Sequence, residues 1–238
     1  MIRKIRKNDQ MRDISIRKDF ISHPEGSVLI SFGETKVICN ATVTSGVPPF
    51  LRDSGKGWVT AEYAMLPRAT HTRNQRESQK GKPDSRSQEI SRLVGRSLRA
   101  AVDLEKIGDH TVTIDCDVIQ ADGGTRTAAI TGGFCAMYLA FRWMIKNGML
   151  EQNPVTGIVS AVSVGIVMGT PLLDLEYVED SIADVDMNLV VKDCRDIVEI
   201  QGSAEKAAFG RDRLNEMLDL AFIGIESITK AQKQVLGL

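Results

Sequence analysis

The sequence lacks several features that define common protein classes. It has four cysteines in 238 residues, and none of them forms a CxxC pair. This wide spacing argues against a cysteine metal site and against the disulfide framework of a small secreted protein. No apolar run approaches the ~20 residues of a membrane span, and no apolar stretch follows the basic N-terminus as in a secretory signal. We therefore expect a cytoplasmic protein that does not enter a membrane.

Familiar catalytic motifs and a strong net charge are also missing. The sequence has no GxxxxGK[ST] phosphate loop and no GxSxG nucleophile elbow, and its three histidines lack metal-ligand spacing. The formal net charge is −1, so any attraction to nucleic acid has to be local. A hydrophobic content of 42% and a charged content of 26% are ordinary for a globular protein. We expect one domain spanning residues 1–238.

A local excess of positive charge lies between residues 66 and 99. Three acidic residues there face nine basic ones, namely Arg68, Arg73, Arg76, Lys80, Lys82, Arg86, Arg92, Arg96 and Arg99. Arg92, Arg96 and Arg99 have the i, i+4, i+7 spacing of one helix face. Such an excess suits an RNA backbone. A solvated loop and helix face, or an arginine-rich subunit interface, explains the same pattern.

The periodicity of apolar residues predicts an α+β fold with mixed sheets packed against long helices, close in character to α/β. Alternation predicts strands in residues 27–43, with a turn at Gly33–Glu34, and in 110–122, 158–169 and 183–202. Helical spacing covers residues 88–104, 125–146 and 210–236. Ser85 and Gln88 fit a capping box, which would place Arg86 in the first turn of a helix. Gly132 and Gly133, within a predicted helix, indicate that another element packs closely there.

The sequence ADGGTRT, residues 121–127, connects a predicted strand to a predicted helix. Its glycines would let the backbone approach a ligand closely, and Thr125 could cap the helix. The free amides and the positive end of the helix dipole would then favour an anion, and Arg126 offers a planar fork that suits phosphate oxygens. A tight turn with a surface arginine is the alternative interpretation.

Acidic residues gather in EDSIADVDMN, residues 179–188. Asp180, Asp184 and Asp186 are separated by even numbers of residues. A strand beginning near Asp184 would place Asp184, Asp186 and Asn188 on one face. Carboxylates on one face repel each other unless a cation lies between them, and their hard oxygen atoms suit Mg²⁺ or Mn²⁺. A solvated acidic edge strand is the alternative.

The longer motifs resemble the ribonuclease PH family, in the same order over nearly the whole chain. They are the segments 55–78, 85–103, 114–133, 173–188 and 198–205. The resemblance implies a phosphate-dependent 3′-to-5′ exoribonuclease, a nucleotidyltransferase that shortens tRNA precursors and other RNAs and releases nucleoside diphosphates. It also implies two-layer βαβ units and a homohexameric ring, built as a trimer of dimers.

The resemblance assigns roles to individual residues as well. The phosphate site, which takes inorganic phosphate as co-substrate, would consist of Arg86, Gly124, Thr125 and Arg126. The essential aspartates, as catalytic residues and ligands of Mg²⁺ or Mn²⁺, would be Asp180 and Asp186, with Asp180 open between metal binding and proton transfer. RNA backbone contacts and subunit contacts would divide among Arg68, Arg73, Arg76, Arg92, Arg96 and Arg99.

Two other functions compete with this interpretation. A non-catalytic RNA-binding ring subunit would be expected to lose the arginine, the glycine-rich turn or the aspartates, and this chain has them all. A metal-dependent hydrolytic nuclease would have no use for an anion site of this kind. We therefore expect phosphorolysis.

Overall fold

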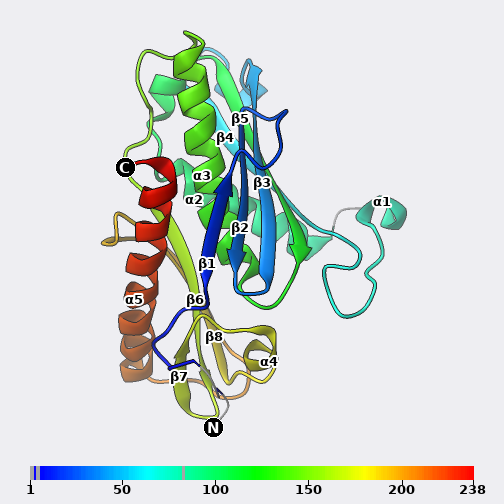
Figure 1. Cartoon of the computed structure of the whole chain (residues 1–238), viewed down its shortest axis with the longest axis vertical. Coiled ribbons are helices and arrows are strands. Elements are labelled where there is room, and N and C mark those ends of the chain that lie inside the picture. The colour runs from blue at the N-terminus through cyan, green and yellow to red at the C-terminus, as the bar shows by residue number, and fades with distance from the viewer. Residues whose placement is uncertain (1–2, 4–5, 82–83) are drawn as a thin grey trace.

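One mixed sheet, one antiparallel sheet and three long helices form the fold (Figure 1). The computed structural model describes residue 3 and residues 6–81 and 84–238. The first sheet has the order β1-β2-β3-β5-β4, with β4 parallel to β5 and the other neighbours antiparallel. Its strands are β1 (Ile14–Lys18), β2 (Gly26–Phe32), β3 (Thr35–Ser45), β4 (Trp58–Met65) and β5 (His110–Gln120). The two strands and the tight turn expected in residues 27–43 are therefore confirmed as β2 and β3.

The second sheet is antiparallel throughout and has the order β7-β6-β8-β9. Its strands are β6 (Val159–Val167), β7 (Thr170–Leu173), β8 (Val185–Lys192) and β9 (Asp196–Ala204). The short helix α4 (Tyr177–Asp180) connects β7 to β8. Sequence periodicity did not predict this helix, since four residues make barely one turn.

The central helix α3 (Thr125–Lys146) packs between the two sheets, against β2 and β3 on one side and β6 on the other. A Cβ atom on Gly132 would lie 2.7 Å from Ile30 Cγ2 and 2.8 Å from Cys39 Sγ. The close approach predicted at Gly132 is therefore confirmed. By length and mean hydropathy α3 could cross a membrane, but 72% of its most apolar stretch is buried inside the protein.

Two further helices cover the sheets, as Figure 1 shows. α5 (Arg211–Leu236) packs on β6 and β7, and α2 (Ser85–Arg99) packs on β4. Shorter elements are α1 (Glu77–Lys80), which lies on a projecting loop, and two 3-10 turns, η1 (Pro49–Leu51) and η2 (Leu104–Ile107). The apolar core is continuous from the first sheet through α3 to the second sheet and α5.

The start of α2 corrects one prediction. Asp84 is the N-cap, and its side chain accepts a 3.0 Å hydrogen bond from the Arg86 amide. Ser85 is the first helical residue, so the Ser85–Gln88 capping box is wrong. An aspartate caps a helix as well as a serine does. The prediction that Arg86 lies in the first turn is confirmed.

Candidate active site

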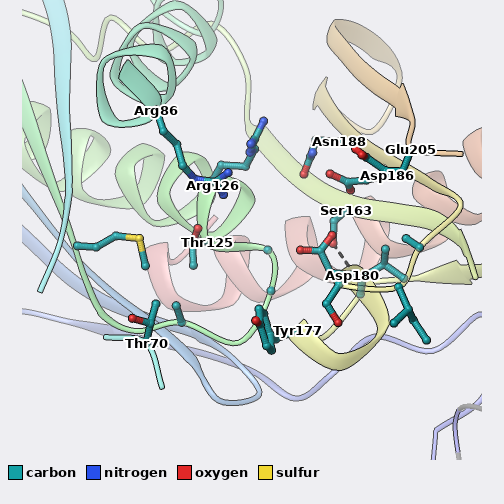
Figure 2. A pocket seen from close by; sticks show the side chains of 18 of the residues that line it. Thr70, Arg86, Thr125, Arg126, Ser163, Tyr177, Asp180, Asp186, Asn188 and Glu205 are labelled. Atoms are coloured by element: carbon teal, nitrogen blue, oxygen red, sulfur yellow. Dashed lines mark hydrogen bonds between the residues drawn. The ribbon is translucent and has the colours of Figure 1, made fainter. Parts of the chain in front are cut away.

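A pocket of about 780 Å³ opens where the two sheets meet. One wall is the turn between β5 and α3, together with the start of α2. The opposite wall is α4, β8 and the end of β9. Figure 2 shows Arg86, Thr125 and Arg126 on the first wall, facing Asp180, Asp186, Asn188 and Glu205 on the second. The pocket thus has a cationic side and an anionic side.

The glycine-rich turn adopts a backbone that ordinary side chains disfavour. Gly123 and Gly124 have φ values of +76° and +67°, in the left-handed region that glycine enters without strain. A Cβ atom on Gly123 would overlap the carbonyl oxygen of Leu175. Both glycines line the pocket. The close backbone approach expected from the sequence is therefore present.

Thr125 has a different place from the one expected. Gly124 is the N-cap of α3 and Thr125 is its first residue, without a side-chain capping bond. The Thr125 hydroxyl instead accepts a 2.8 Å hydrogen bond from Tyr63 on β4. The cap prediction is wrong, because the left-handed Gly124 already makes the turn. The first amides of this 22-residue helix still face the pocket with the positive end of its dipole.

Two arginines from different helices reach the same end of the pocket. Arg86 comes from the first turn of α2, and its guanidinium has no hydrogen-bond partner among the described residues. Arg126 donates a 2.8 Å hydrogen bond from Nη1 to Gln201 of β9 and lies 3.7 Å from Glu89. Gln201 thereby orients Arg126 and leaves further donors of the fork free. Both arginines and the turn amides can bind one anion with two or more oxygens.

The two aspartates come from separate elements. Asp180 is the last residue of α4, and Asp186 is the second residue of β8, opposite Gly165 of β6. Neither carboxylate accepts a hydrogen bond from another residue that the structure describes. Asn188 lies on the same face of β8 and also lines the pocket. The alternation of side chains along β8 therefore explains why Asp186 and Asn188 both face the pocket, whereas Asp180 reaches the pocket from α4.

Burial and nearby negative charges raise the pKa of both carboxylates. Desolvation raises the pKa of Asp186 to about 6, and the negative charges of Asp180 and Glu205 add to this effect against Arg126 and Arg86. Desolvation also raises the pKa of Asp180, although Arg86 and Arg126 act in the opposite direction. Two partly buried carboxylates without a cationic partner in contact are typical of a functional site.

These residues fit a divalent cation that takes its remaining ligands from water and substrate. Mg²⁺ commonly binds through one or two carboxylates together with phosphate oxygens. Within the described part of the chain, no cluster of three acidic, cysteine or histidine side chains is arranged as a complete metal cage. Asp180 and Asp186 supply the hard oxygen donors that Mg²⁺ or Mn²⁺ prefers.

Asp184 does not belong to the pocket. Its carboxylate lies 2.7 Å from Lys206 Nζ and accepts a 3.2 Å hydrogen bond from the Gly169 amide. The bond from Lys206 lowers the pKa of Asp184, in contrast to the raised pKa of Asp186. The expectation that Asp184 and Asp186 share one site is therefore wrong: Asp184 precedes β8 and closes a turn with Lys206.

The remaining arginines of the basic segment divide into two groups. Arg96 forms a bidentate pair with Glu199 at 2.6 and 2.8 Å, and Arg99 stacks on the Trp58 ring at 4.3 Å while it donates to the Val59 carbonyl. These two serve contacts within the chain. Arg68, Arg73, Arg76 and Arg92 are exposed, as is Arg96 despite its pair with Glu199. Lys82 lies outside the described residues.

Several pocket residues were not singled out from the sequence. Ser163 lies on a strand that is buried along its whole length, so no pattern marks it. Tyr177 opens α4, and its ring lies 5.4 Å from that of His71. Glu205 follows β9 and lies in a motif that carries the family resemblance, although the motif alone did not give it a role. Glu205 adds a third carboxylate to the pocket, and its neighbour Lys206 also lines it.

Comparisons with known proteins agree with this geometry. Residues 10–142 match the first domain and residues 157–224 the second domain of the "3′ exoribonuclease family". The Ribonuclease PH of Syntrophomonas wolfei is 56% identical over 98% of this chain and 97% of its own, and that of Bacillus subtilis is 58% identical over 98% and 95%. A chain of the Archaeoglobus fulgidus exosome, solved with RNA bound to the active site, shares the fold. It has a TM-score of 0.80 and 23% identity over 94% of this chain and 90% of that one. This chain therefore belongs to the ribonuclease PH family of 3′ exoribonucleases.

Proposed function

We infer that the protein is a phosphate-dependent 3′-to-5′ exoribonuclease, a nucleotidyltransferase that shortens the 3′ ends of tRNA precursors and other RNAs. The observation that carries this inference is a pocket with two opposite walls. Arg86 and Arg126 lie beside the start of α3 on one wall, and on the other lie Asp180 and Asp186, whose carboxylates accept no hydrogen bond from the described residues. Close relatives named Ribonuclease PH, at 56–58% identity over nearly the full chain, support the same reaction.

The cationic wall would bind inorganic phosphate, the co-substrate. At neutral pH a phosphate monoanion or dianion needs compensation before it can approach another phosphate group. Arg86, Arg126 and the amides that follow Gly123 and Gly124 would supply this compensation and direct one phosphate oxygen toward the RNA. Phosphoryl transfer depends chiefly on such positioning and charge stabilisation.

The anionic wall would hold the scissile end of the RNA through a metal ion. A bound Mg²⁺ or Mn²⁺ supplies charge stabilisation to the phosphate oxygens on which negative charge develops. Asp186 would be a ligand, because its carboxylate is oriented into the pocket beside that of Asp180. Asp180 would either share the ion or move a proton, and its raised pKa is compatible with both roles.

The reaction balances without a further reactant. An oxygen of orthophosphate forms a bond to the phosphorus of the last phosphodiester. The bond from that phosphorus to the 3′ oxygen of the preceding nucleotide breaks, and this oxygen takes up a proton. The products are a nucleoside diphosphate and an RNA shorter by one residue, so the reaction can run in either direction.

The two competing functions have less support. A non-catalytic ring subunit would not need an intact anion pocket facing paired carboxylates. A hydrolytic nuclease would use water as the nucleophile. It would therefore have no phosphate co-substrate to bind at Arg86, Arg126 and the start of α3. We therefore favour phosphorolysis over both.

We further propose that the protein assembles as a homohexameric ring, a trimer of dimers. The fold shared with a chain of an exosome, which is itself an assembly, supports this proposal. The exposed arginines Arg68, Arg73, Arg76 and Arg92 are available for RNA or for a neighbouring subunit, whereas Arg96 and Arg99 are occupied within the chain. Tests of oligomeric state by light scattering would show a mass about six times 26.1 kDa. A cytoplasmic location stays a prediction.

Product chemistry tests the function directly. A 3′-labelled oligoribonucleotide would be incubated with the protein and Mg²⁺, with and without phosphate. We expect labelled nucleoside diphosphates only when phosphate is present. Nucleoside monophosphates formed without phosphate would indicate hydrolysis and overturn the proposal. An Asp186→Ala variant should bind RNA and release no product.

A further inference from the structure

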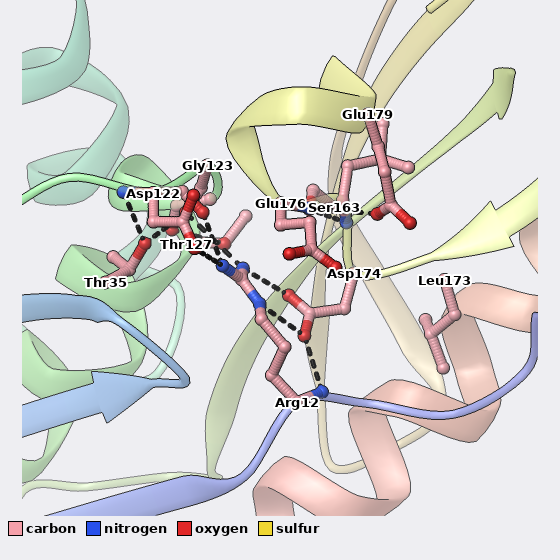
Figure 3. A network of polar contacts seen from close by, with 12 residues as sticks. Arg12, Thr35, Asp122, Gly123, Thr127, Ser163, Leu173, Asp174, Glu176 and Glu179 are labelled. Carbon is pink, nitrogen blue, oxygen red and sulfur yellow. Dashed lines mark hydrogen bonds and ion pairs between the residues drawn. The ribbon is translucent and has the colours of Figure 1, made fainter. Parts of the chain in front are cut away.

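A buried arginine lies directly behind the glycine-rich turn. Arg12, just before β1, is 9% exposed and does not line the pocket. Its backbone amide and Nε donate to Asp174 Oδ2 at 2.8 and 3.0 Å, and its Nη2 donates to Asp174 Oδ1 at 2.7 Å. Asp174 is 1% exposed. The two bonds from the guanidinium fix it in one orientation against the buried carboxylate, and the backbone bond holds residue 12 beside Asp174 (Figure 3).

The other end of this guanidinium holds the turn itself. Nη1 donates to the carbonyl oxygen of Asp122, and Nη2 lies 3.4 Å from the carbonyl oxygen of Gly123. Thr35 donates to the same Gly123 oxygen at 2.6 Å. In a trans peptide the carbonyl and the next amide point in opposite directions. Carbonyls held toward Arg12 therefore direct the amides of Gly123 and Gly124 away from Arg12.

The same network reaches the helix that carries Asp180. Asp174 has a φ of +55° and directly follows β7, three residues before α4 begins. The first amide of α4, that of Tyr177, donates to Asp122 Oδ1 at 3.2 Å. Glu179, next to Asp180, is buried and pairs with Arg3. Arg12 and Asp174 thus connect the cationic wall of the pocket to its anionic wall from behind.

We propose that Arg12 is a positioning residue, which through Asp174 fixes the glycine-rich turn for orthophosphate and holds that turn in register with α4. This inference rests on the proposed function. A positioning role of this kind affects how well phosphate binds, because the amides must point at the anion before it arrives. It should leave RNA binding unchanged, since Arg12 does not line the pocket that holds the arginines and the aspartates.

The test compares Arg12→Lys with a matched control, Arg17→Lys. Lysine keeps the positive charge, but its single ammonium group cannot replace the planar guanidinium, which contacts Asp174 and two carbonyl oxygens at once. Arg17 lies on the adjoining strand β1, where its guanidinium stacks 5.5 Å from the Phe20 ring, away from the turn. We expect Arg12→Lys to raise the KM for phosphate about tenfold, within the range known for residues that support a ligand site from behind. The Kd for RNA measured without phosphate should stay within about twofold, and Arg17→Lys should match the wild type.

A second variant separates positioning from stability. Removing Arg12 alone would take away both guanidinium bonds to the buried Asp174 carboxylate and leave Arg6, at 3.2 Å, as its remaining cationic partner, which is destabilising. The double variant Arg12→Met with Asp174→Asn removes both charges, and asparagine tolerates a positive φ. We expect the double variant to be more stable to urea than Arg12→Met and still to have the raised KM for phosphate.

The outcomes distinguish a failure of the proposed function from a failure of the role assigned to Arg12. If the wild type releases no nucleoside diphosphates, the proposed function fails. If the wild type is active and Arg12→Lys keeps the wild-type KM for phosphate, or loses RNA affinity to the same extent, Arg12 is merely structural and the inference is overturned. A KM for phosphate that returns to the wild-type value in the double variant would overturn it as well.

Discussion

Replacing Asp186 with asparagine should stabilise the folded protein while it abolishes catalysis. Burial raises the pKa of Asp186 from 3.8 to about 6, with Asp180 as the next cause. One pKa unit corresponds to about 1.4 kcal/mol, so the ionised carboxylate costs the fold up to about 3 kcal/mol at neutral pH. Asparagine has the same shape without the charge, but its amide is also partly buried. We therefore expect a net gain of about 1–3 kcal/mol in the free energy of unfolding.

The gain should depend on pH in a defined direction. Because the pKa of Asp186 is raised in the folded state, binding a proton there stabilises the folded protein. This contribution to the free energy of unfolding is fully present below about pH 3.8. That contribution disappears as the pH rises through about 6. The difference between Asp186→Asn and the wild type should therefore be largest at pH 7.5 and should shrink at pH 4.5. Urea unfolding at both pH values in the presence of a chelator measures it.

Asp184→Asn is the matched control. Asp184 lies two residues away, but Lys206 lowers its pKa, so its removal should not stabilise the protein at pH 7.5. Added Mg²⁺ should stabilise the wild type and not Asp186→Asn, since a ligand that binds only the folded state raises its stability. Equal stability of Asp186→Asn and the wild type at pH 7.5, or a gain that does not change with pH, would refute the electrostatic reasoning.

Three further predictions concern the pocket. Arg126→Ala should raise the KM for phosphate at least about tenfold and change the Kd for RNA by less than about threefold; equal effects on both would contradict a phosphate role. Gly123→Ala should lower the free energy of unfolding by about 2 kcal/mol or more in urea, because its Cβ would overlap the Leu175 carbonyl; wild-type stability would contradict this. The rate at low Mg²⁺ should rise with pH through about 6 as Asp186 ionises, and more Mg²⁺ should shift the rise to lower pH because a cation favours the carboxylate; a pH-independent rate would contradict this.

Local patterns were sufficient to predict most of the long elements. Apolar periodicity gave α3 and β5 to within about two residues, and the turn between them was recognised from its glycines. The helix starts were harder. Asp84 and Ser85 are both good capping residues, so sequence alone could not decide between them, and the left-handed conformation of Gly124 removed the need for Thr125 as a cap.

Long-range contacts account for what the sequence did not reveal. Asp180 reaches the pocket because residues 177–180 form one helical turn, which periodicity cannot detect. Asp184 lies outside the pocket and pairs instead with Lys206, 22 residues later in the chain. Arg12 and Asp174 are 162 residues apart, and nothing in either local sequence predicts their three hydrogen bonds.

The anion pocket itself can be tested most directly by crystallography. Crystals would be soaked in tungstate, an anomalous scatterer with the tetrahedral shape of phosphate, with Arg126→Ala crystals as the control. We expect one strong peak between the guanidinium groups of Arg86 and Arg126, next to the first amides of α3, and its loss in the variant. Guanidinium groups that point apart with no anion between them, or tungstate bound only elsewhere, would contradict the proposed phosphate site.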